Sequence, residues 1–362
     1  MSLLRQFAAA SSAGRAESAV ARLTGYFDKG SGHVKSRLTV AAGVVVALVF
    51  AAWLTYATGG TQYVYLHLMY LPIVVAGMVF GLAGGVLTGV VGGLLVGPVM
   101  PISVEAGTMQ PWEGWLYRLG FFALIGGVAG ATATAVNQKV AKVAGTYART
   151  LRAFSSLVAL RDEQTGGHCE RVAHNACAVG ELLGVRGSEL QALYWAGILH
   201  DLGKVATPAE ILLKPGRLTE GEYREVQKHA AAGAELLLSI SNDFAPIAAG
   251  VRSHHERWDG CGYPDGLKAQ AIPLFGRILA VVDVFEALTS KRPYRGPMPA
   301  EEALAHVKRE QGQHFDPEVV AAFEQLYFEG RVCVAEHDRH SVPARYEAPV
   351  PVGLVKEPVS VN

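Results

Sequence analysis

The sequence has few cysteines, no excess of either charge, and almost no charge over much of its first third. Its 362 residues include 32 Lys and Arg against 32 Asp and Glu, so the net charge gives no reason to expect a nucleic-acid polymer as partner. The four cysteines, Cys169, Cys177, Cys261 and Cys333, form no C-x-x-C pair. We therefore expect reduced thiols of a cytosolic domain and not a disulfide framework.

Four apolar runs fill the region with little charge, where Glu105, Glu113 and Arg118 are the acidic and basic residues. The runs cover residues 38–58, 63–80, 82–99 and 115–136, and each is about as long as a helix needs to be to cross a bilayer. No cleavage-site pattern follows the first run, so we expect no signal peptide. Residues 38–136 are predicted to form a four-helix transmembrane bundle, with glycines that allow close helix packing.

The distribution of lysine and arginine predicts how these spans are oriented. Residues 1–37 are mildly basic, and lysines and arginines also follow residue 136, whereas the loops 58–62 and 98–114 contain neither. Cytoplasmic flanks carry such an excess of basic residues. We therefore expect a multi-pass membrane protein with a cytoplasmic lead-in over residues 1–37 and a soluble part in the cytoplasm.

A stripe of residues at alternating spacings of four and three follows the last run. Its members are Val140, Ala144, Tyr147, Leu151, Phe154 and Val158. Such a stripe indicates either a parallel two-chain coiled coil or one face of an amphipathic helix that packs on its own domain. Because the stripe directly continues the last run, we predict a linker signalling helix over residues 137–160 that joins two copies of the chain in a homodimer.

The remaining residues show a helical pattern up to about residue 329 and little alternation typical of strands. The soluble domain is therefore predicted to be all-α. Beyond Gly330 the sequence is rich in Pro and Val without a helical period. Residues 330–362 are predicted to form a disordered tail.

Seven potential metal ligands accumulate in the soluble part. They are His168, His200, Asp201, His229, His254, His255 and Asp283. Imidazoles with a few carboxylates suit Fe, Mn, Zn or Ni better than Mg or Ca. Seven ligands are too many for one ion, so the set indicates two ions bridged by a carboxylate. Asp201 and Asp283 lie in or next to apolar helices, where an unpaired carboxylate would be costly and a metal would offset its charge.

Five motifs carry a resemblance to a known family. HDLGK, ILLKPGRLTEGEYREVQKH, HHERWDGCGYPDGL, IPLFGRILAVVDVFEALTSKRPYR and GQHFDP occur in this order. In them the chain resembles the HD-GYP family, bacterial metal-dependent phosphodiesterases that act on cyclic di-GMP. The resemblance implies an all-helical HD-type phosphohydrolase domain over residues 151–329 that hydrolyses cyclic di-GMP to pGpG or GMP. It also implies a bacterial inner (cytoplasmic) membrane for the apolar part, which resembles other sensor regions only in layout.

The resemblance also implies roles for single residues. One metal site would comprise His168, His200, Asp201 and Asp283. The second ion would be held by His229, His254 and His255, with Asp201 bridging. Contacts with the substrate would come from Lys204 at the scissile phosphate, Tyr263 beside the guanine, and Arg292 and Arg295 at the other phosphate. Of these, Lys204 and Asp201 would take part in catalysis.

One position departs from the family pattern. Members with a third metal have a glutamate four residues before the first histidine ligand, and here that position is Gln164, with Glu163 one place earlier. A shift of one residue turns a helical side chain by about 100°. We therefore expect two divalent ions, Fe or Mn before Zn or Ni. Two alternatives remain at this point: a non-catalytic receptor for cyclic di-GMP, and an HD hydrolase that acts on another nucleotide.

Overall fold

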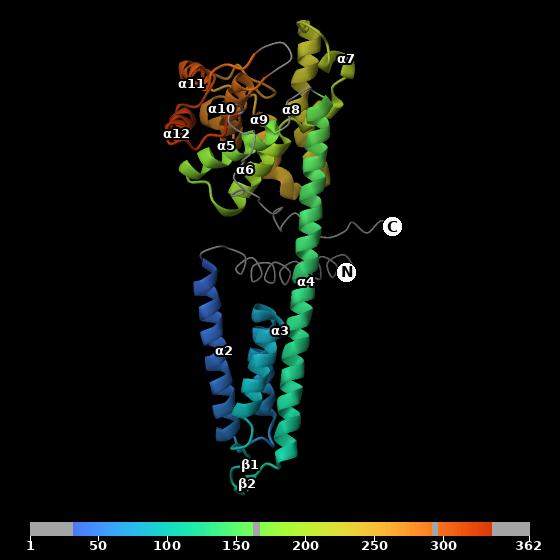
Figure 1. The fold of residues 1–362 in the computed structure, drawn as a ribbon, viewed down its shortest axis with the longest axis vertical. Coiled ribbons are helices and arrows are strands. Elements are labelled where there is room, and N and C mark those ends of the chain that lie inside the picture. The colour runs from blue at the N-terminus through green and yellow to red at the C-terminus, as the bar shows by residue number, and fades with distance from the viewer. Residues whose placement is uncertain (1–31, 162–166, 292–295, 335–362) are drawn as a thin grey trace, which may run out of the picture. The chain divides into compact units, whose positions relative to one another are not determined.

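The structure is a computed structural model and describes residues 32–161, 167–291 and 296–334. These residues are almost entirely helical, which confirms the predicted all-α class (Figure 1). The chain divides into two compact units, residues 1–140 and 141–362. One long helix, α4 (Trp112–Arg161), contributes residues to both units.

The first unit consists of apolar helices and one short β-hairpin. Its elements are α2 (Gly32–Ala57), the 3-10 helix η1 (Val64–Met69), α3 (Tyr70–Leu95), the antiparallel strands β1 (Pro101–Ser103) and β2 (Thr108–Met109), and the first part of α4. Among the described residues, three helical stretches are long and apolar enough to cross a membrane: Arg37–Ala57, Val64–Leu95 and Trp112–Val158. Their length and composition suggest that this unit associates with a membrane.

The second of these stretches folds back on itself at Gly81, which has φ 72° and ψ −162°. A Cβ atom at Gly85 would lie 2.9 Å from the Cα atom of Gly77, so the residues after Gly81 run antiparallel to those before it. The three stretches therefore contain the four predicted apolar segments, two of which are joined without a loop. The expected spans 63–80 and 82–99 are the two arms of one stretch, and the second arm ends already at Leu95. Glycine adopts this φ without steric cost, so the chain reverses without a loop.

Glycines of the second arm lie directly on the backbone of α4. A Cβ atom would lie 2.0 Å from the carbonyl oxygen of Gly126 if placed on Gly85, and 2.4 Å from that of Phe122 if placed on Gly89. No side chain fits at such distances. The glycines in this arm therefore serve close helix packing, as the sequence predicted.

The second unit is a bundle of short helices around one hydrophobic core. Its elements after α4 are α5 (His168–Leu182), α6 (Gly187–Leu199), η2 (Leu202–Ala206), α7 (Ala209–Leu212), α8 (Glu220–Ile240), η3 (Asn242–Phe244), α9 (Ala245–Ser253), η4 (Ala269–Ala271), α10 (Leu274–Thr289), α11 (Ala300–Arg309) and α12 (Pro317–Phe328). Helix α10 contacts α5, α9, α11 and α12, while α6 packs against α5 and α9. The metal-ligand candidates lie at the ends or in the middle of these central helices.

Local sequence signals explain several helix ends. Thr219 accepts a hydrogen bond from the Glu222 backbone N–H, and the Glu222 carboxylate accepts one from the Thr219 N–H, which forms a capping box at the start of α8. Asp316 caps α12 and is followed by Pro317 at the first helical position. These caps set where α8 and α12 begin.

The predicted linker stripe does not form one surface. Ala144, Leu151 and Val158 are buried, and the latter two belong to the core of the second unit, whereas Phe154 is 54% exposed. The buried residues lie on the same face of α4 as Ala148 and Ser155, which are also buried. The alternative interpretation, packing on the helix's own domain, therefore holds for Leu151 and Val158. The side chain of Tyr147 lies outside the described part of the chain, and the homodimer stays a prediction.

The first residues of the predicted tail are docked. The Asn175 side-chain amide donates to the Cys333 carbonyl at 3.0 Å, and its oxygen accepts from the Cys333 N–H at 2.8 Å. Asn175 is only 1% exposed. The prediction of disorder is therefore wrong for residues 330–334, and residues 335–362 lie outside the described part.

Candidate metal centre

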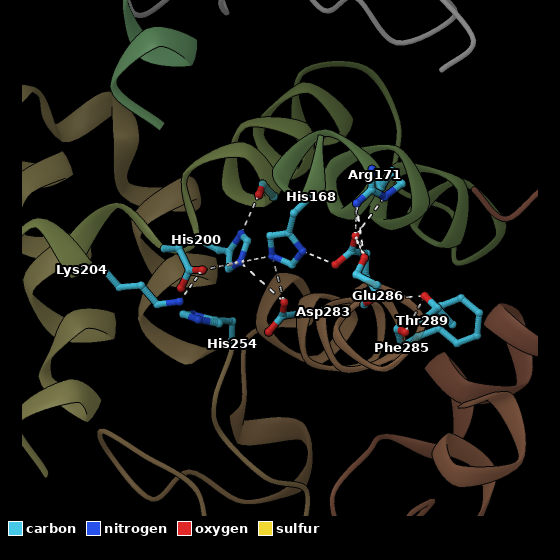
Figure 2. Close-up of polar contacts among 12 residues, drawn as sticks. His168, Arg171, His200, Lys204, His254, Asp283, Phe285, Glu286 and Thr289 are labelled. Carbon is cyan, nitrogen blue, oxygen red and sulfur yellow. Dashed lines mark hydrogen bonds and ion pairs between the residues drawn. The ribbon is translucent and has the colours of Figure 1, made fainter. Parts of the chain in front are cut away.

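The seven predicted metal ligands converge from five helices. His168 opens α5, His200 and Asp201 follow the last residue of α6, His229 lies in α8, His254 and His255 follow α9, and Asp283 lies in α10. Two groups could each hold a metal ion, with ligand atoms within 4.8 Å of one another. The first group is His168, His200 and Asp283, and the second is His229, His254 and His255. Figure 2 shows how the side chains of the first group point toward one another.

Asp201 lies between the two groups. Its Oδ2 atom is 3.4 Å from Nε2 of His200, and its Oδ1 atom is 3.6 Å from Nε2 of His229. One carboxylate oxygen therefore faces each group. This is the arrangement expected of a carboxylate that bridges two ions.

Three of the histidines are oriented by their own helices. The Nδ1 atom lies 2.8 Å from the Gly197 carbonyl in His200, 2.7 Å from the Val226 carbonyl in His229, and 2.6 Å from the Val251 carbonyl in His254. A carbonyl oxygen can only accept, so Nδ1 carries the proton in each ring. The lone pair is then on Nε2, which points into the site and is free to bind a metal.

His168 is oriented differently because it is the first residue of its helix. Its Nδ1 atom contacts Oε2 of Glu286, a carboxylate that is 1% exposed (Figure 2). The other oxygen of Glu286 accepts from Nε of Arg171 at 2.9 Å and from the Ser290 hydroxyl at 2.6 Å. Glu286 follows Asp283 by three residues on α10, so the same helix face supplies one ligand and the residue that orients another.

Glu286 and Arg171 are not among the site residues predicted from the sequence. The signal was present as a second carboxylate three residues after Asp283 in the apolar helix LFGRILAVVDVFEALT. A buried charge in such a helix requires a partner.

The two groups differ in their electrostatics. Burial alone would lower the pKa of His168, but hydrogen bonds to Asp283 and Glu286 raise it to about 9. The pKa of His200 is also raised, because Asp201 outweighs burial. In the second group burial lowers the pKa of His229 and His254, and it lowers that of His255 to about 3. A metal must therefore displace protons in the first group, whereas the second group is already neutral.

Both central carboxylates are held in the charged form. Burial alone would raise the pKa of Asp201, but Lys204 and His200 lower it. The pKa of Asp283 is likewise lowered, because a hydrogen bond from His168 and the charge of His200 outweigh burial. Both aspartates are therefore available as anionic ligands.

The predicted substrate residues are placed in part. Nζ of Lys204 is 2.8 Å from Oδ2 of Asp201, at the edge of the centre. The ring of Tyr263 lies 4.8 Å from that of His255, at an interplanar angle of 31°. Arg292 and Arg295 lie outside the described residues, as do Glu163 and Gln164.

Gly203 lets the HDLGK segment approach α8. A Cβ atom at this position would lie 1.9 Å from the His229 carbonyl oxygen. Only a glycine allows η2, which carries Lys204, to lie against the helix that carries His229. The glycine of this motif therefore brings the two groups of ligands together.

A further buried carboxylate holds the Gly-Tyr-Pro turn. Glu256 is 2% exposed and accepts hydrogen bonds from the backbone N–H groups of Asp265 at 2.7 Å and Leu267 at 3.0 Å. The peptide bond between Tyr263 and Pro264 is cis. Sequence reasoning did not single out Glu256, although it lies directly after the two histidines.

Comparison with known proteins agrees with this geometry. Residues 152–319 match the family described as HD domain. This match, together with the five motifs, supports an HD domain of the HD-GYP family. The chain is 44% identical over 174 residues to the cyclic di-GMP phosphodiesterase response regulator RpfG of Xanthomonas campestris pv. campestris, which covers 48% of this chain and 46% of that protein.

Two further relatives are similar to this chain at about the same level of identity. A cyclic di-GMP phosphodiesterase of Thermotoga maritima is 40% identical over 177 residues, 49% of this chain and 48% of that protein. The 3'3'-cGAMP-specific phosphodiesterase 2 of Vibrio cholerae is 40% identical over 168 residues, 46% of this chain and 32% of that protein. The chain thus aligns with half or less of the length of these relatives.

Proposed function

We propose that the chain is a membrane-anchored, metal-dependent phosphodiesterase that hydrolyses cyclic di-GMP to pGpG, GMP or both. The observation that carries this proposal is the pair of ligand groups facing each other across Asp201. The relatives in Xanthomonas and Thermotoga, which are named as cyclic di-GMP phosphodiesterases, support the choice of substrate.

The residues of both groups fit metal ions. In each oriented histidine the Nε2 lone pair points toward the Nε2 atom of another ring, at 3.4 Å between His168 and His200 and 3.4 Å between His229 and His254. These converging nitrogens, neutral in the second group and freed of protons by a metal in the first, lie next to two anionic carboxylates and suit cations of the Fe or Mn type. Bound there, two such ions would supply a hydroxide near neutral pH and stabilise negative charge on the phosphoryl group.

The protein's own side chains would bind the substrate and transfer the proton. Lys204 lies at the edge of the centre, where its ammonium group would offset charge on the phosphoryl oxygens and donate a proton to the leaving ribose oxygen. Tyr263 would stack beside a guanine base. Arg292 and Arg295 are proposed to hold the second phosphate by charge-assisted hydrogen bonds.

A second candidate substrate is another cyclic dinucleotide, because the relative in Vibrio is named as specific for 3'3'-cGAMP. The two substrates share both phosphates and one guanine and differ in the other base. The metal groups would act equally on either, so selectivity must come from residues around the bases, such as Tyr263. A receptor without catalysis has no need of seven ligands.

The location and assembly belong to the same proposal. We place the chain in the bacterial inner membrane as a multi-pass protein with its HD domain in the cytoplasm, where cyclic dinucleotides are found. The membrane unit would act as a sensor, and the linker would join two copies. The absence of Lys and Arg from the loops 58–62 and 98–114 supports this orientation.

The test is a substrate comparison with the full chain in detergent. Mn- or Fe-loaded protein is incubated with cyclic di-GMP and, separately, with 3'3'-cGAMP, and the products are separated by chromatography. We expect pGpG or GMP from cyclic di-GMP, and no product from Asp201→Ala. The matched control, Asp243→Ala, alters an exposed aspartate and should retain full activity. Unchanged cyclic di-GMP with cleaved 3'3'-cGAMP would favour the second candidate, and binding without cleavage would favour a receptor.

A further inference from the structure

Helix α4 contributes a buried hydroxyl to the HD domain. Ser155 is 8% exposed, and its Oγ donates to the Ile198 carbonyl oxygen at 2.6 Å. Ile198 lies in the last turn of α6, two residues before His200. The neighbouring carbonyl, that of Gly197, accepts from the His200 ring. Ser155 therefore binds the same helix turn that orients a predicted metal ligand.

The same hydroxyl reaches a second ligand segment. The Ser155 side chain also interacts with the thiol of Cys169, the residue that follows His168 on α5, and partly offsets the rise that burial causes in the pKa of this thiol. His168 and His200 lie 3.4 Å apart at their Nε2 atoms. One side chain of α4 thus links the two segments directly behind two facing imidazoles.

Neighbouring contacts hold this face of α4 in place. Arg152 donates from Nη2 to the Tyr194 hydroxyl at 3.1 Å, and its guanidinium lies 5.9 Å from the centre of the Tyr194 ring and 5.8 Å from that of Trp195. Leu151 and Val158 belong to the core one turn on either side of Ser155. Such a packed and hydrogen-bonded face resists sliding or rotation of α4 relative to α6.

We propose that Ser155 is a positioning residue for the metal centre, which fixes the spacing of His168 and His200 by tying α5 and α6 to α4. The proposal rests on the metal-dependent function given above and adds a part of the machinery outside the HD motifs. Because α4 is continuous with the apolar unit, the helix that carries this hydroxyl is also the direct covalent connection to the proposed sensor. Movement of α4 would therefore change the spacing of the His168 and His200 imidazoles.

The experiment compares Ser155→Ala with Ser156→Ala in the full chain in detergent. Ser156 is the next residue on α4 and is exposed, so it controls for loss of a serine from this helix. Each protein is titrated with Co²⁺, and the visible absorption reports the ligand geometry independently of catalysis. Residues behind the ligands commonly change metal affinity by about 10-fold to 100-fold. We expect a loss near the lower end for Ser155→Ala together with an altered spectrum, and neither change for Ser156→Ala.

A third variant separates positioning from packing. Ser155→Thr keeps the hydroxyl, and we expect it to recover the affinity and the spectrum. The inference is overturned if Ser155→Ala binds Co²⁺ like the wild type, or if Ser155→Thr loses as much affinity as Ser155→Ala. If the wild type itself binds no Co²⁺, the proposed function fails and the inference fails with it. The two failures are therefore distinguishable.

Discussion

Replacing Glu286 by glutamine should reverse the tautomer of His168. One Glu286 oxygen accepts hydrogen bonds from Arg171 and Ser290. Because a guanidinium can only donate, the oxygen of a glutamine would take that position. The amide NH₂ would then point at Nδ1 of His168, which at present contacts Oε2 of the carboxylate. An NH₂ group can only donate, so Nδ1 would become the acceptor and the proton would move to Nε2. The atom required for metal binding would then be blocked.

The expected loss follows from this change. Partners that orient a metal-bound histidine contribute about 10-fold to 100-fold in metal affinity, or about 1.4 to 2.7 kcal/mol. We expect a loss in this range for the first ligand group and none for the second, whose rings are held by backbone carbonyls. Competition with a chelator of known affinity measures the metal affinity of each group. The matched control is Glu235→Gln, on the exposed face of α8. Wild-type affinity in both groups of Glu286→Gln would refute the reasoning.

First, the pKa of His168 is raised from a usual 6.5 to about 9. The protonated ring therefore stabilises the metal-free protein fully below pH 6.5, and this stabilisation is lost as the pH rises through about 9. The metal affinity of the first group should therefore rise about tenfold per pH unit over this window, while that of the second group stays nearly constant. Competition with a chelator from pH 6 to pH 9.5 measures both affinities. An equal dependence on pH in the two groups would contradict the prediction. Second, Gly203→Ala should destabilise the domain by about 1–3 kcal/mol, because the His229 carbonyl leaves no space for a Cβ atom. Gly221 lies in open space, so Gly221→Ala should not destabilise it. Thermal unfolding of both variants tests the difference. Third, elemental analysis of anaerobically prepared protein should give about two ions per chain, and a reproducible third ion would show that the substitution at Gln164 does not remove a site.

Much of the fold and the centre was predictable from residue type and spacing. The apolar runs, the helical period and the histidines next to HDLGK and the GYP turn are all local features of the sequence. The break between residues 80 and 82 was predicted where the structure reverses, but the sequence did not indicate that a single glycine, Gly81, would replace the loop that normally marks a reversal. The stripe that begins at Val140 was assigned to a partner chain, although its residues Leu151 and Val158 pack on their own domain. Neighbouring stripes on one helix have the same period, so spacing alone does not say which one is covered.

The role of Glu286 depends on tertiary structure. It could be inferred only after α5 and α10 were placed side by side, because its partners His168 and Arg171 are more than a hundred residues away. Ser155 is similar, since nothing in its own helix indicates that it meets the end of α6. Ligands are set by side-chain chemistry, whereas the residues that orient them are set by packing.

The most direct test of the two-ion centre combines magnetic resonance with turnover in the same sample. The metal-free full chain is titrated with Mn²⁺, and electron paramagnetic resonance distinguishes isolated ions from a pair coupled through a bridging carboxylate. We expect hydrolysis of cyclic di-GMP to rise together with the coupled signal, and we expect Asp201→Ala to lose both. Full hydrolysis with isolated ions alone, or a coupled signal that survives in Asp201→Ala, would contradict this expectation.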